Sequence, residues 1–417
     1  MVEEDYIVRS IERVLDDAAK TFRVVMVGGA RQVGKSTLMR RYLSGRANVK
    51  MVTLDNPSLR QAAKEDPELF LSQYPAPLLI DEFQYAPELL PFIKIAVDNN
   101  DAPGQYFLTG SQLFKMMECV GESLAGRIAV LSLSSLSYAE IVGNAGCLPF
   151  VPYASWTNSV PMTLQEAQNA VFRGGMPAFV RRGSTLNRDL FFSSYVQTYI
   201  ERDIRKVVNV RDIGKFTTFL ACAAARTGEE LVYDDLASSV GIDAKTVKSW
   251  IAVLEATGIV YLLKPWSGNA TKRIVKRPKL HFMDTGLACY LARIPDSASL
   301  FASSQAGHFF ESWVVGQIVR SYQFAGVDPS LHLYFYRDDA KREIDLLVAR
   351  SGSLYPVEIK MSANPGVAAM KSFGVIDEMG IERGPGCVLS LVQDVVPVRG
   401  LGAIVNVSAL WQSNQQL

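Results

Sequence analysis

Short apolar runs alternate with helix-length amphipathic stretches over the first 142 residues. The runs are rich in Val, Ile, Leu and Phe, and the first of them ends in two glycines. Continuous apolar runs separated by helix-length segments predict parallel strands whose two faces are both covered by helices. We therefore expect an α/β core with five strands, at residues 22–28, 49–55, 78–81, 106–109 and 128–133.

The pattern changes at residues 143–163, where Gly, Asn, Pro and Ser occur without a clear period. This composition is typical of a linker or an insertion. Helical spacing resumes at residue 164 and dominates to residue 256. An apolar run at 259–264, a turn at 267–269 and a second run from residue 273 then predict a β-hairpin.

A helix–turn–helix pattern precedes this hairpin. Residues 233–237 begin a short helix, residues 239–242 form a turn, and Asp243 stands where the N-cap of the next helix is expected. The second helix, at residues 244–256, has an apolar stripe made of Val247, Trp250, Ile251 and Leu254. The order of these segments matches a winged helix-turn-helix.

The last part of the chain predicts a second α/β domain. An amphipathic stretch at 307–322 is followed by strand-like runs at 331–336, 343–349 and 354–359. We expect four parts in all: an α/β core at 1–142, a linker and helical lid at 143–210, a winged helix at 211–299 and an α/β domain at 300–417.

Composition narrows the class of protein. A chain of 417 residues with 48% hydrophobic and 20% charged residues is too long for one core and is globular. The net charge of +1 indicates nucleic-acid binding only if basic residues gather locally. Five scattered cysteines and three histidines argue against a disulfide framework and against a zinc site. An acidic start and the lack of a long apolar span predict a cytoplasmic protein without a membrane partner.

A glycine-rich segment directly follows the first apolar run and directly precedes a predicted helix. It reads Gly-Ala-Arg-Gln-Val-Gly-Lys-Ser at residues 29–36, which is the P-loop pattern. Its glycines let backbone N–H groups face phosphates, its lysine contacts the β- and γ-phosphates, and its serine hydroxyl contacts Mg²⁺. We therefore expect ATP and Mg²⁺, with Ser36 on the metal and the nucleotide held by Gly29, Ala30, Arg31, Gln32, Val33, Gly34, Lys35, Ser36 and Thr37.

Polar residues end two later apolar runs. Asp81 and Glu82 follow the run at 78–81, where Asp81 can hold the Mg²⁺ shell and Glu82 can polarise the attacking water. Thr109 and Ser111 end the run at 106–109 and are candidates to sense the γ-phosphate. The alternatives are a solvated loop for the acidic pair and ordinary turn residues for the other two.

These motifs together resemble the AAA+ ATPases. The match is particularly good to a bacterial and archaeal group that joins such a core to a C-terminal domain of unknown function, DUF4143. It covers about residues 20–205, with further matches near the C-terminus. Relatives often carry proline where this chain has Ala30, and we expect that departure to matter little. The matching segments are Gly-Ala-Arg-Gln-Val-Gly-Lys-Ser, Ile-Asp-Glu-Phe-Gln, Leu-Thr-Gly-Ser-Gln, Ser-Leu-Ala-Gly-Arg, Phe-Arg-Gly-Gly-Met-Pro and Tyr-Ile-Glu-Arg-Asp-Ile.

The resemblance implies a role for Arg127 and a ring of subunits. In AAA+ rings an arginine before the fifth strand reaches the γ-phosphate of the neighbouring subunit and stabilises the transition state. Arg127 occupies that position, so a homo-oligomer is implied, with six subunits by family analogy. The alternative is an arginine that a helix C-terminus favours electrostatically. Arg173 is a weaker candidate for a lid arginine, and a surface role suits it better.

Two features of the middle part favour DNA as a partner. The exposed face of the second helix would carry short polar and basic side chains, namely Lys245, Thr246, Lys248 and Ser249. Basic residues also gather in and after the hairpin turn, at Lys272, Arg273, Lys276, Arg277 and Lys279. The alternative is a winged helix that only packs or binds protein.

The last domain carries a pattern of acidic residues and one lysine. Glu311 lies on the amphipathic stretch, Asp345 on the second strand, and Glu358 with Lys360 on the third. The order resembles the Asp…Glu-x-Lys signature of the restriction-endonuclease-like fold. That resemblance implies a divalent metal on Asp345 and Glu358, assisted by Glu311, with Lys360 orienting or activating the water. The alternative is a strand edge with solvated charges.

Taken together, the sequence predicts an ATP-hydrolysing AAA+ ATPase that acts on DNA, with a metal-dependent nuclease site in its last domain. One alternative is a regulatory switch of the defence or toxin–antitoxin kind, in which ATP controls assembly and the last domain binds a partner. A second alternative is an ATPase that remodels proteins without nucleic acid.

Overall fold

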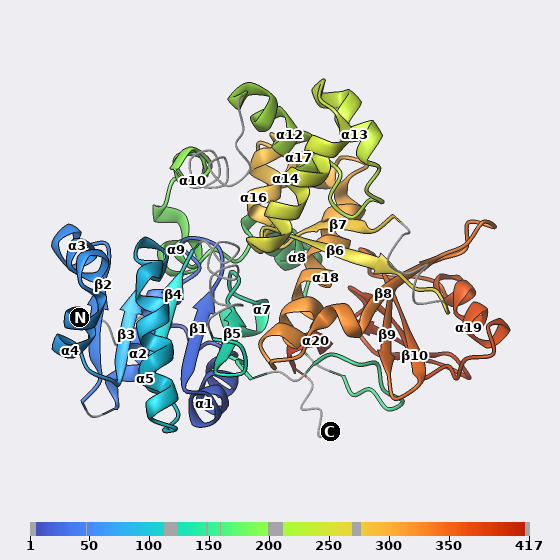
Figure 1. The fold of residues 1–417 in the computed structure, drawn as a ribbon. Helices are drawn as coiled ribbons and strands as arrows, with labels where there is room; N and C mark the ends of the chain where they lie inside the picture. The colour runs from blue at the N-terminus through green and yellow to red at the C-terminus, as the bar shows by residue number, and fades with distance from the viewer. Residues whose placement is uncertain are drawn as a thin grey trace. The chain divides into compact units, whose positions relative to one another are not determined.

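The chain folds into two compact units (Figure 1). The computed structural model describes residues 6–46, 48–111, 124–146, 149–158, 160–198, 212–268 and 277–412. The first unit contains residues 1–136, 256–258 and 323–326, and the second contains the rest. Within the described ranges, no helix combines the length and the apolar character needed to cross a bilayer.

The first unit is built on a five-stranded sheet in the order β2-β3-β4-β1-β5, with every neighbouring pair parallel. Its strands are β1 (Val24–Gly28), β2 (Lys50–Thr53), β3 (Leu78–Asp81), β4 (Tyr106–Gly110) and β5 (Ile128–Ser132). Its helices are α1 (Glu12–Thr21), α2 (Lys35–Ser44), α3 (Pro57–Glu65), α4 (Pro67–Gln73) and α5 (Leu90–Asn99). The predicted α/β class and parallel sheet core are confirmed.

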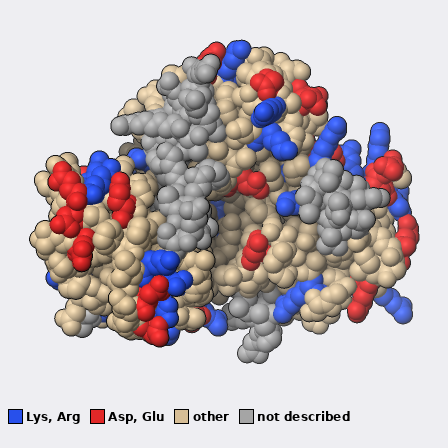
Figure 2. Space-filling model, viewed as in Figure 1, with Lys and Arg blue, Asp and Glu red and all other residues tan. Residues whose placement is uncertain are grey.

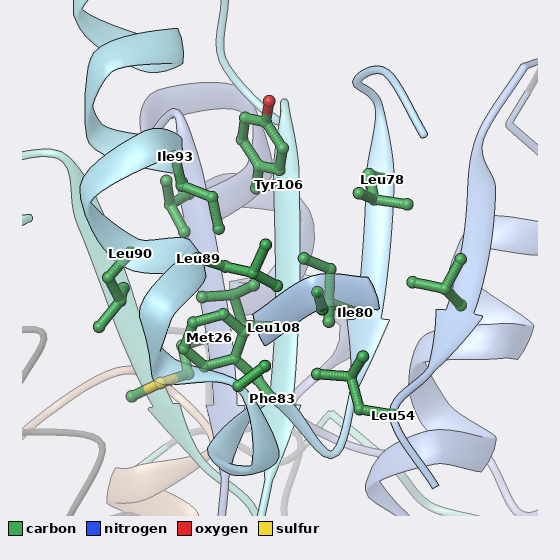
Figure 3. Close-up of a cluster of buried hydrophobic side chains, with 14 of the residues drawn as sticks. Met26, Leu54, Leu78, Ile80, Phe83, Leu89, Leu90, Ile93, Tyr106 and Leu108 are labelled. Atoms are coloured by element: carbon green, nitrogen blue, oxygen red, sulfur yellow. The ribbon is translucent and has the colours of Figure 1, made fainter. Parts of the chain in front are cut away.

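Both faces of this sheet are buried. On one face, side chains of β1, β3 and β4 pack against α3, α4 and α5 in a large apolar cluster (Figure 3). Side chains alternate between faces along a strand, so Leu108 turns into this cluster and Phe107 turns to the opposite face. There the ring of Tyr42 on α2 meets the ring of Phe107 edge-on, with centroids 6.3 Å apart. The central strands β1, β3 and β4 are buried at every position, which explains their nearly continuous apolar sequence.

The second unit contains an eight-stranded mixed sheet in the order β12-β13-β11-β10-β9-β8-β6-β7. β6 pairs with β7 in antiparallel fashion, as expected for a hairpin, and pairs with β8 in parallel on its other side. Strand pairing therefore continues from the hairpin into the C-terminal strands. The strands are β6 (Val260–Pro265), β7 (Lys279–Phe282), β8 (Leu333–Arg337), β9 (Glu343–Arg350), β10 (Ser353–Ile359), β11 (Gly386–Ser390), β12 (Val396–Val398) and β13 (Gly402–Asn406).

A helix–turn–helix precedes β6, as the sequence predicts. α13 (Tyr233–Val240) ends at Gly241, and α14 (Ala244–Ala256) begins after Asp243, whose Oδ1 accepts the Thr246 N–H at 2.8 Å. The predicted stripe of α14 is buried. Its Trp250 meets rings of α12 (Ile213–Ala225) at centroid distances of 5.0 Å. Burial of this stripe leaves the opposite side of α14 to solvent.

The segment before α8 (Leu164–Arg173) has no helix or strand at its described residues 149–158 and 160–163. It is nevertheless fastened to the second unit by its backbone. The Phe150 N–H donates to Ser321 Oγ at 3.1 Å, and Tyr322 Oη donates to the Phe150 carbonyl at 2.9 Å. Asn406 of β13 accepts the Met162 N–H at 2.9 Å. Both ends of the expected linker are therefore tied to α18 (Ala306–Gln323) and to the sheet.

The Phe-Arg-Gly-Gly-Met-Pro segment at residues 172–177 makes a close backbone crossing. Asp284, the N-cap of α16 (Thr285–Leu291), accepts the Gly175 N–H at 2.9 Å. A Cβ added at Gly286 would lie 2.3 Å from the carbonyl oxygen of Arg173. A Cβ added at Gly174 would in turn lie 2.8 Å from the Gly286 nitrogen. The crossing therefore explains Gly174 and Gly286, because a side chain at either would separate the two backbones.

This crossing predicts that Gly286→Ala destabilises the protein, whereas Gly307→Ala, in the first turn of α18, does not. The first substitution forces backbone apart and should cost about 1–3 kcal/mol. A Cβ at Gly307 meets no atom within 4 Å. Thermal unfolding of both variants checks this, and equal melting temperatures would contradict the account of the motif.

Candidate functional site

The loop between β1 and α2 takes backbone conformations that favour glycine. Gly29 has φ 141°, and a Cβ there would lie 2.0 Å from the Leu133 carbonyl oxygen. Gly34 has φ 98° and stands at the N-cap of α2. The backbone conformation therefore favours glycine at both positions. The loop ends at Gly34, and α2 begins at the next residue.

Arg9 fastens this loop from outside the motif. Its Nη1 donates to the Val33 carbonyl at 2.8 Å and its Nη2 donates to the Ser134 carbonyl at 2.9 Å. The side chain is buried, with 4% of the residue exposed. Arg9 therefore joins the loop to the segment after β5. Sequence reasoning missed this residue because no motif surrounds it and its partners are backbone atoms distant along the chain.

The side chain of Lys35 folds back onto the backbone of the P-loop. Its Nζ donates to the carbonyl oxygens of Gly29 at 3.0 Å and of Ala30 at 2.7 Å. Burial lowers the pKa of Lys35 to about 8, against the opposing effect of the nearby Glu82 and Asp81 carboxylates. A negatively charged phosphate beside this ammonium would favour its protonated form.

Asp81, at the end of β3, is the point where the predicted magnesium ligands meet. Its Oδ1 accepts from Ser36 Oγ at 2.9 Å and from Thr109 Oγ1 in a short hydrogen bond. Arg40 of α2 forms an ion pair with its Oδ2 at 3.7 Å, a contact that the sequence did not suggest. The structure thus brings Ser36, Asp81 and Thr109 together at the carboxyl ends of β3 and β4.

Glu82 is held by Gln84 next to this carboxylate. It has φ 56°, and its Oε2 accepts a short hydrogen bond from Gln84 Nε2. The same Nε2 lies 3.4 Å from Ser111 Oγ, so Gln84 links Glu82 to Ser111. Burial raises the pKa of Glu82, whereas the hydrogen bond from Gln84 lowers it. The sequence places Gln84 in the Ile-Asp-Glu-Phe-Gln motif but does not predict its contact with Glu82.

The whole set fits ATP with Mg²⁺. Arg31 and Ser36 are half-buried, Gln32 and Thr37 are exposed, and Val33 is buried in the loop. The first N–H groups of α2 have no partner within the helix and favour an anion at this end. An ammonium, a hydroxyl and two carboxylates lie beside this helix end. These are the donors that a magnesium-bound triphosphate needs.

Arg127 lies at the amino-terminal end of the parallel strands, and the P-loop lies at their carboxyl end. Arg127 directly precedes β5, whose Ile128 is in register with Val24, the first residue of β1. The P-loop follows the other end of β1. The guanidinium forms a two-point contact with Asp98 of α5, where Nη2 lies 3.1 Å from Oδ2 and Nε makes a shorter bond to Oδ1. The helix expected before Arg127 lies outside the described residues.

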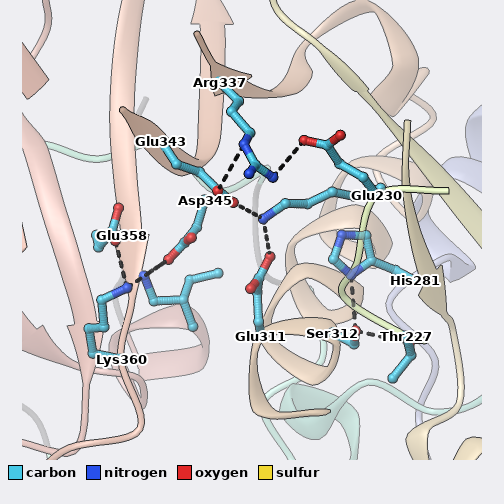
Figure 4. Close-up of polar contacts among 12 residues, drawn as sticks. Thr227, Glu230, His281, Glu311, Ser312, Arg337, Glu343, Asp345, Glu358 and Lys360 are labelled. Atoms are coloured by element: carbon cyan, nitrogen blue, oxygen red, sulfur yellow. Dashed lines mark hydrogen bonds and ion pairs between the residues drawn. The ribbon is translucent and has the colours of Figure 1, made fainter. Parts of the chain in front are cut away.

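Three predicted residues of the last domain come together at the paired strands β9 and β10. Lys360 Nζ lies 2.6 Å from Glu358 Oε1 and 3.4 Å from Asp345 Oδ2 (Figure 4). The Ile359 N–H also donates to Asp345 Oδ2 at 2.9 Å. Burial and the Asp345 charge raise the pKa of Glu358 to about 7, although Lys360 opposes the rise.

Glu311 of α18 is paired with a different lysine. Lys279 Nζ of β7 lies 2.9 Å from Glu311 Oε1 and 2.6 Å from Glu343 Oε1. Among the residues that the structure describes, no group of three or more His, Cys, Asp or Glu side chains is placed to hold a metal ion. The metal-ligand roles of Glu311, Asp345 and Glu358 therefore remain predictions from sequence.

Lys279 does not belong to an exposed basic surface, contrary to the expectation from sequence. Only 4% of the residue is exposed, because β7 packs against α18. Lys245, Lys248 and Ser249 of α14 are exposed, and Thr246 is half-buried and donates to Asp243. Acidic and basic side chains are both visible on the surface (Figure 2). Arg277 is exposed, whereas Lys272, Arg273 and Lys276 lie outside the described residues.

Three segments of the chain match known families. Residues 21–142 match an AAA domain, residues 164–298 match a domain of unknown function, DUF8612, and residues 306–410 match another, DUF4143. An AAA domain of the P-loop class uses ATP and Mg²⁺, which agrees with the donors described above.

Similar proteins are found among curated relatives and solved structures. An uncharacterized protein of Mycobacterium tuberculosis is 28% identical over 358 residues, covering 85% of this chain and 74% of that protein. A Walker-type ATPase of Pyrococcus abyssi is 16% identical, covers 70% of this chain and 97% of that chain, and has a TM-score of 0.43. The RuvB Holliday junction branch migration motor of Thermotoga maritima is 18% identical, covers 63% of this chain and 93% of that chain, and has a TM-score of 0.30.

The family matches agree with the loop geometry and with the parallel sheet that carries it. This chain therefore contains a P-loop ATPase domain of the AAA type at residues 21–142, followed by DUF8612 and, at residues 306–410, by DUF4143.

Proposed function

We propose that this ATPase couples ATP hydrolysis to action on DNA. The observation that carries the proposal is the exposed basic side of α14, whose opposite side is buried. Lys245 and Lys248 are both exposed, and three positions along a helix place side chains on neighbouring parts of one face. In helix–turn–helix proteins the second helix enters the major groove.

Hydrolysis itself would use the residues around Asp81. Lys35 would neutralise phosphate charge, and Ser36 with Asp81 would hold the Mg²⁺, which itself neutralises the charge that develops on the phosphates. Glu82 would accept a hydrogen bond from the attacking water and orient it. Thr109, hydrogen-bonded to Asp81, and Ser111, linked to Glu82 through Gln84, would report the state of the γ-phosphate.

DNA should stimulate ATP turnover, and the stimulation should depend on α14. We expect Lys245→Ala/Lys248→Ala to keep basal turnover, to bind DNA more weakly, and to lower the slope of log affinity against log salt by about 1 per lysine. Linear, forked and four-way DNA should be compared in parallel ATPase and binding assays.

The matched control removes two exposed lysines elsewhere, Lys64 of α3 and Lys371 in the 3₁₀ turn Val367–Gly374. Lys64→Ala/Lys371→Ala changes the net charge equally and should keep wild-type binding and salt dependence. ATP turnover that is indifferent to every DNA would contradict the proposal.

We also propose a homo-oligomeric ring in which Arg127 acts on the nucleotide of a neighbouring subunit. The position of Arg127 supports this, because it lies at the end of the strands opposite the P-loop of its own chain. Its guanidinium would have to leave Asp98 to reach a phosphate. The number of subunits, six by family analogy, is part of the proposal.

Arg127→Ala should bind ATP normally and lose turnover by about a thousandfold, the lower range for an arginine finger. Asp98→Asn removes the ion-pair partner and keeps the arginine, so it should retain turnover. Nucleotide binding, turnover and thermal unfolding should be measured for both variants. Equal losses of turnover and stability in the two would instead assign the ion pair a purely structural role.

A regulatory switch is the second candidate function, and the C-terminal carboxylates favour it. Each of them is paired with a lysine, which argues against a metal-dependent nuclease site and so favours a non-catalytic domain. In that case ATP would control assembly, and ATP turnover would respond to a protein partner instead of DNA.

A further inference from the structure

Lys279 contacts Glu311, which the sequence marks as a metal ligand, and Glu343, which it does not. Its Nζ is 2.9 Å from Glu311 Oε1 and 2.6 Å from Glu343 Oε1, and its side chain is 5% exposed. Burial alone would lower the pKa of Lys279, but the charges of Glu311, Asp345 and Glu343 outweigh burial and raise it. The two carboxylate contacts within 3 Å favour the protonated ammonium.

The backbone fixes Lys279 in this place. β7 pairs with β6 on one side, and on the other Lys279 bridges to Glu230, with the Leu231 N–H donating to the Pro278 carbonyl at 2.8 Å. Two residues further along the same strand, His281 Nδ1 lies 3.0 Å from Ser312 Oγ (Figure 4). Alternation along β7 thus turns Lys279 and His281 together onto Glu311 and Ser312 of α18.

These contacts are incompatible with a divalent metal at the same point. A metal such as Mg²⁺ needs several oxygen ligands within about 2.0–2.6 Å of one point. In this cluster Lys279 separates Glu311 from Glu343, and Lys360 bridges Asp345 and Glu358. A metal ion would also be repelled by both ammonium groups.

The cluster nevertheless holds more carboxylates than lysines. Four carboxylates meet two buried or half-buried lysines, and Arg337 reaches only the outer oxygen of Glu343, at 3.9 Å. Glu358 Oε2 is buried and has no hydrogen-bond partner among the described residues. Burial, followed by the Asp345 charge, raises the pKa of Glu311 to about 8, although Lys279 opposes the rise. Lys279 supplies the cation that Glu311 and Glu343 contact.

We infer that Lys279 is the built-in cation of this cluster and excludes a divalent metal from it. The charge comes from β7, a strand outside the segment that matches DUF4143. This cluster as folded then holds no divalent metal, whatever the function of the ATPase. This inference does not depend on the action on DNA.

The test measures Mn²⁺ binding through the loss of the electron paramagnetic resonance signal of free Mn²⁺. The nucleotide-free full chain should carry Asp81→Asn, so that the P-loop carboxylate does not contribute a site. We expect no Mn²⁺ at the cluster of this chain. Adding Lys279→Met should create one site at least about tenfold tighter than any binding without it. Glu343→Gln should abolish that site, because Glu343 is one of the two carboxylates that Lys279 contacts.

Lys264→Met is the matched control, because Lys264 lies on the adjacent strand β6 and is exposed. It removes the same charge and should create no site. Lys279→Met/Glu311→Gln serves as a second variant if the single change impairs folding, since it removes one charge of each sign and leaves Glu343, Asp345 and Glu358.

Two results would overturn the inference. One is Mn²⁺ binding by the chain with Lys279 intact that Glu343→Gln removes, which would make the cluster a metal site as it stands. The other is failure of both Lys279 variants, folded by circular dichroism, to take up Mn²⁺, which would show that Lys279 is not what excludes the metal.

Discussion

Parallel pairing of β3, β4 and β1 brings chemically different side chains to one edge of a sheet. Because the three strands run in the same direction, the P-loop, Asp81 and Thr109 all leave the sheet at its carboxyl end. Ser36 and Thr109 then converge on one buried oxygen of Asp81. Every chemical role assigned to the ATPase domain depends on this convergence. The apolar strands and the helices on both faces serve to hold that register.

Much of this arrangement can be predicted from the sequence because its signals are local. Continuous apolar runs identify the strands, and two glycines with a lysine and a serine at fixed spacing identify the phosphate loop. The clamp of Arg9 on Val33 and Ser134 could not be predicted, since its partners are backbone atoms far along the chain. Gln84 belongs to a local motif, but its position in the sequence does not show whether its amide bonds to Glu82 or faces solvent.

The C-terminal cluster shows the same limit for charged residues. The sequence predicts correctly that Asp345, Glu358 and Lys360 lie together, because strand alternation and adjacent strands are local properties. It does not predict that Lys279 is buried against Glu311, since that contact depends on how β7 packs on α18. A basic residue after a predicted hairpin was therefore expected at the surface. Electrostatic neutralisation inside the protein, rather than DNA, accounts for its charge.

Isothermal titration of ATP with Mg²⁺ into the wild-type chain and into Lys35→Ala tests the central claim most directly. The account predicts one nucleotide per chain for the wild type, and binding at least about 100-fold weaker, or about 2.7 kcal/mol, once the buried ammonium is lost. A wild-type chain that takes up no ATP, or a Lys35→Ala chain that binds it with unchanged affinity, would contradict it.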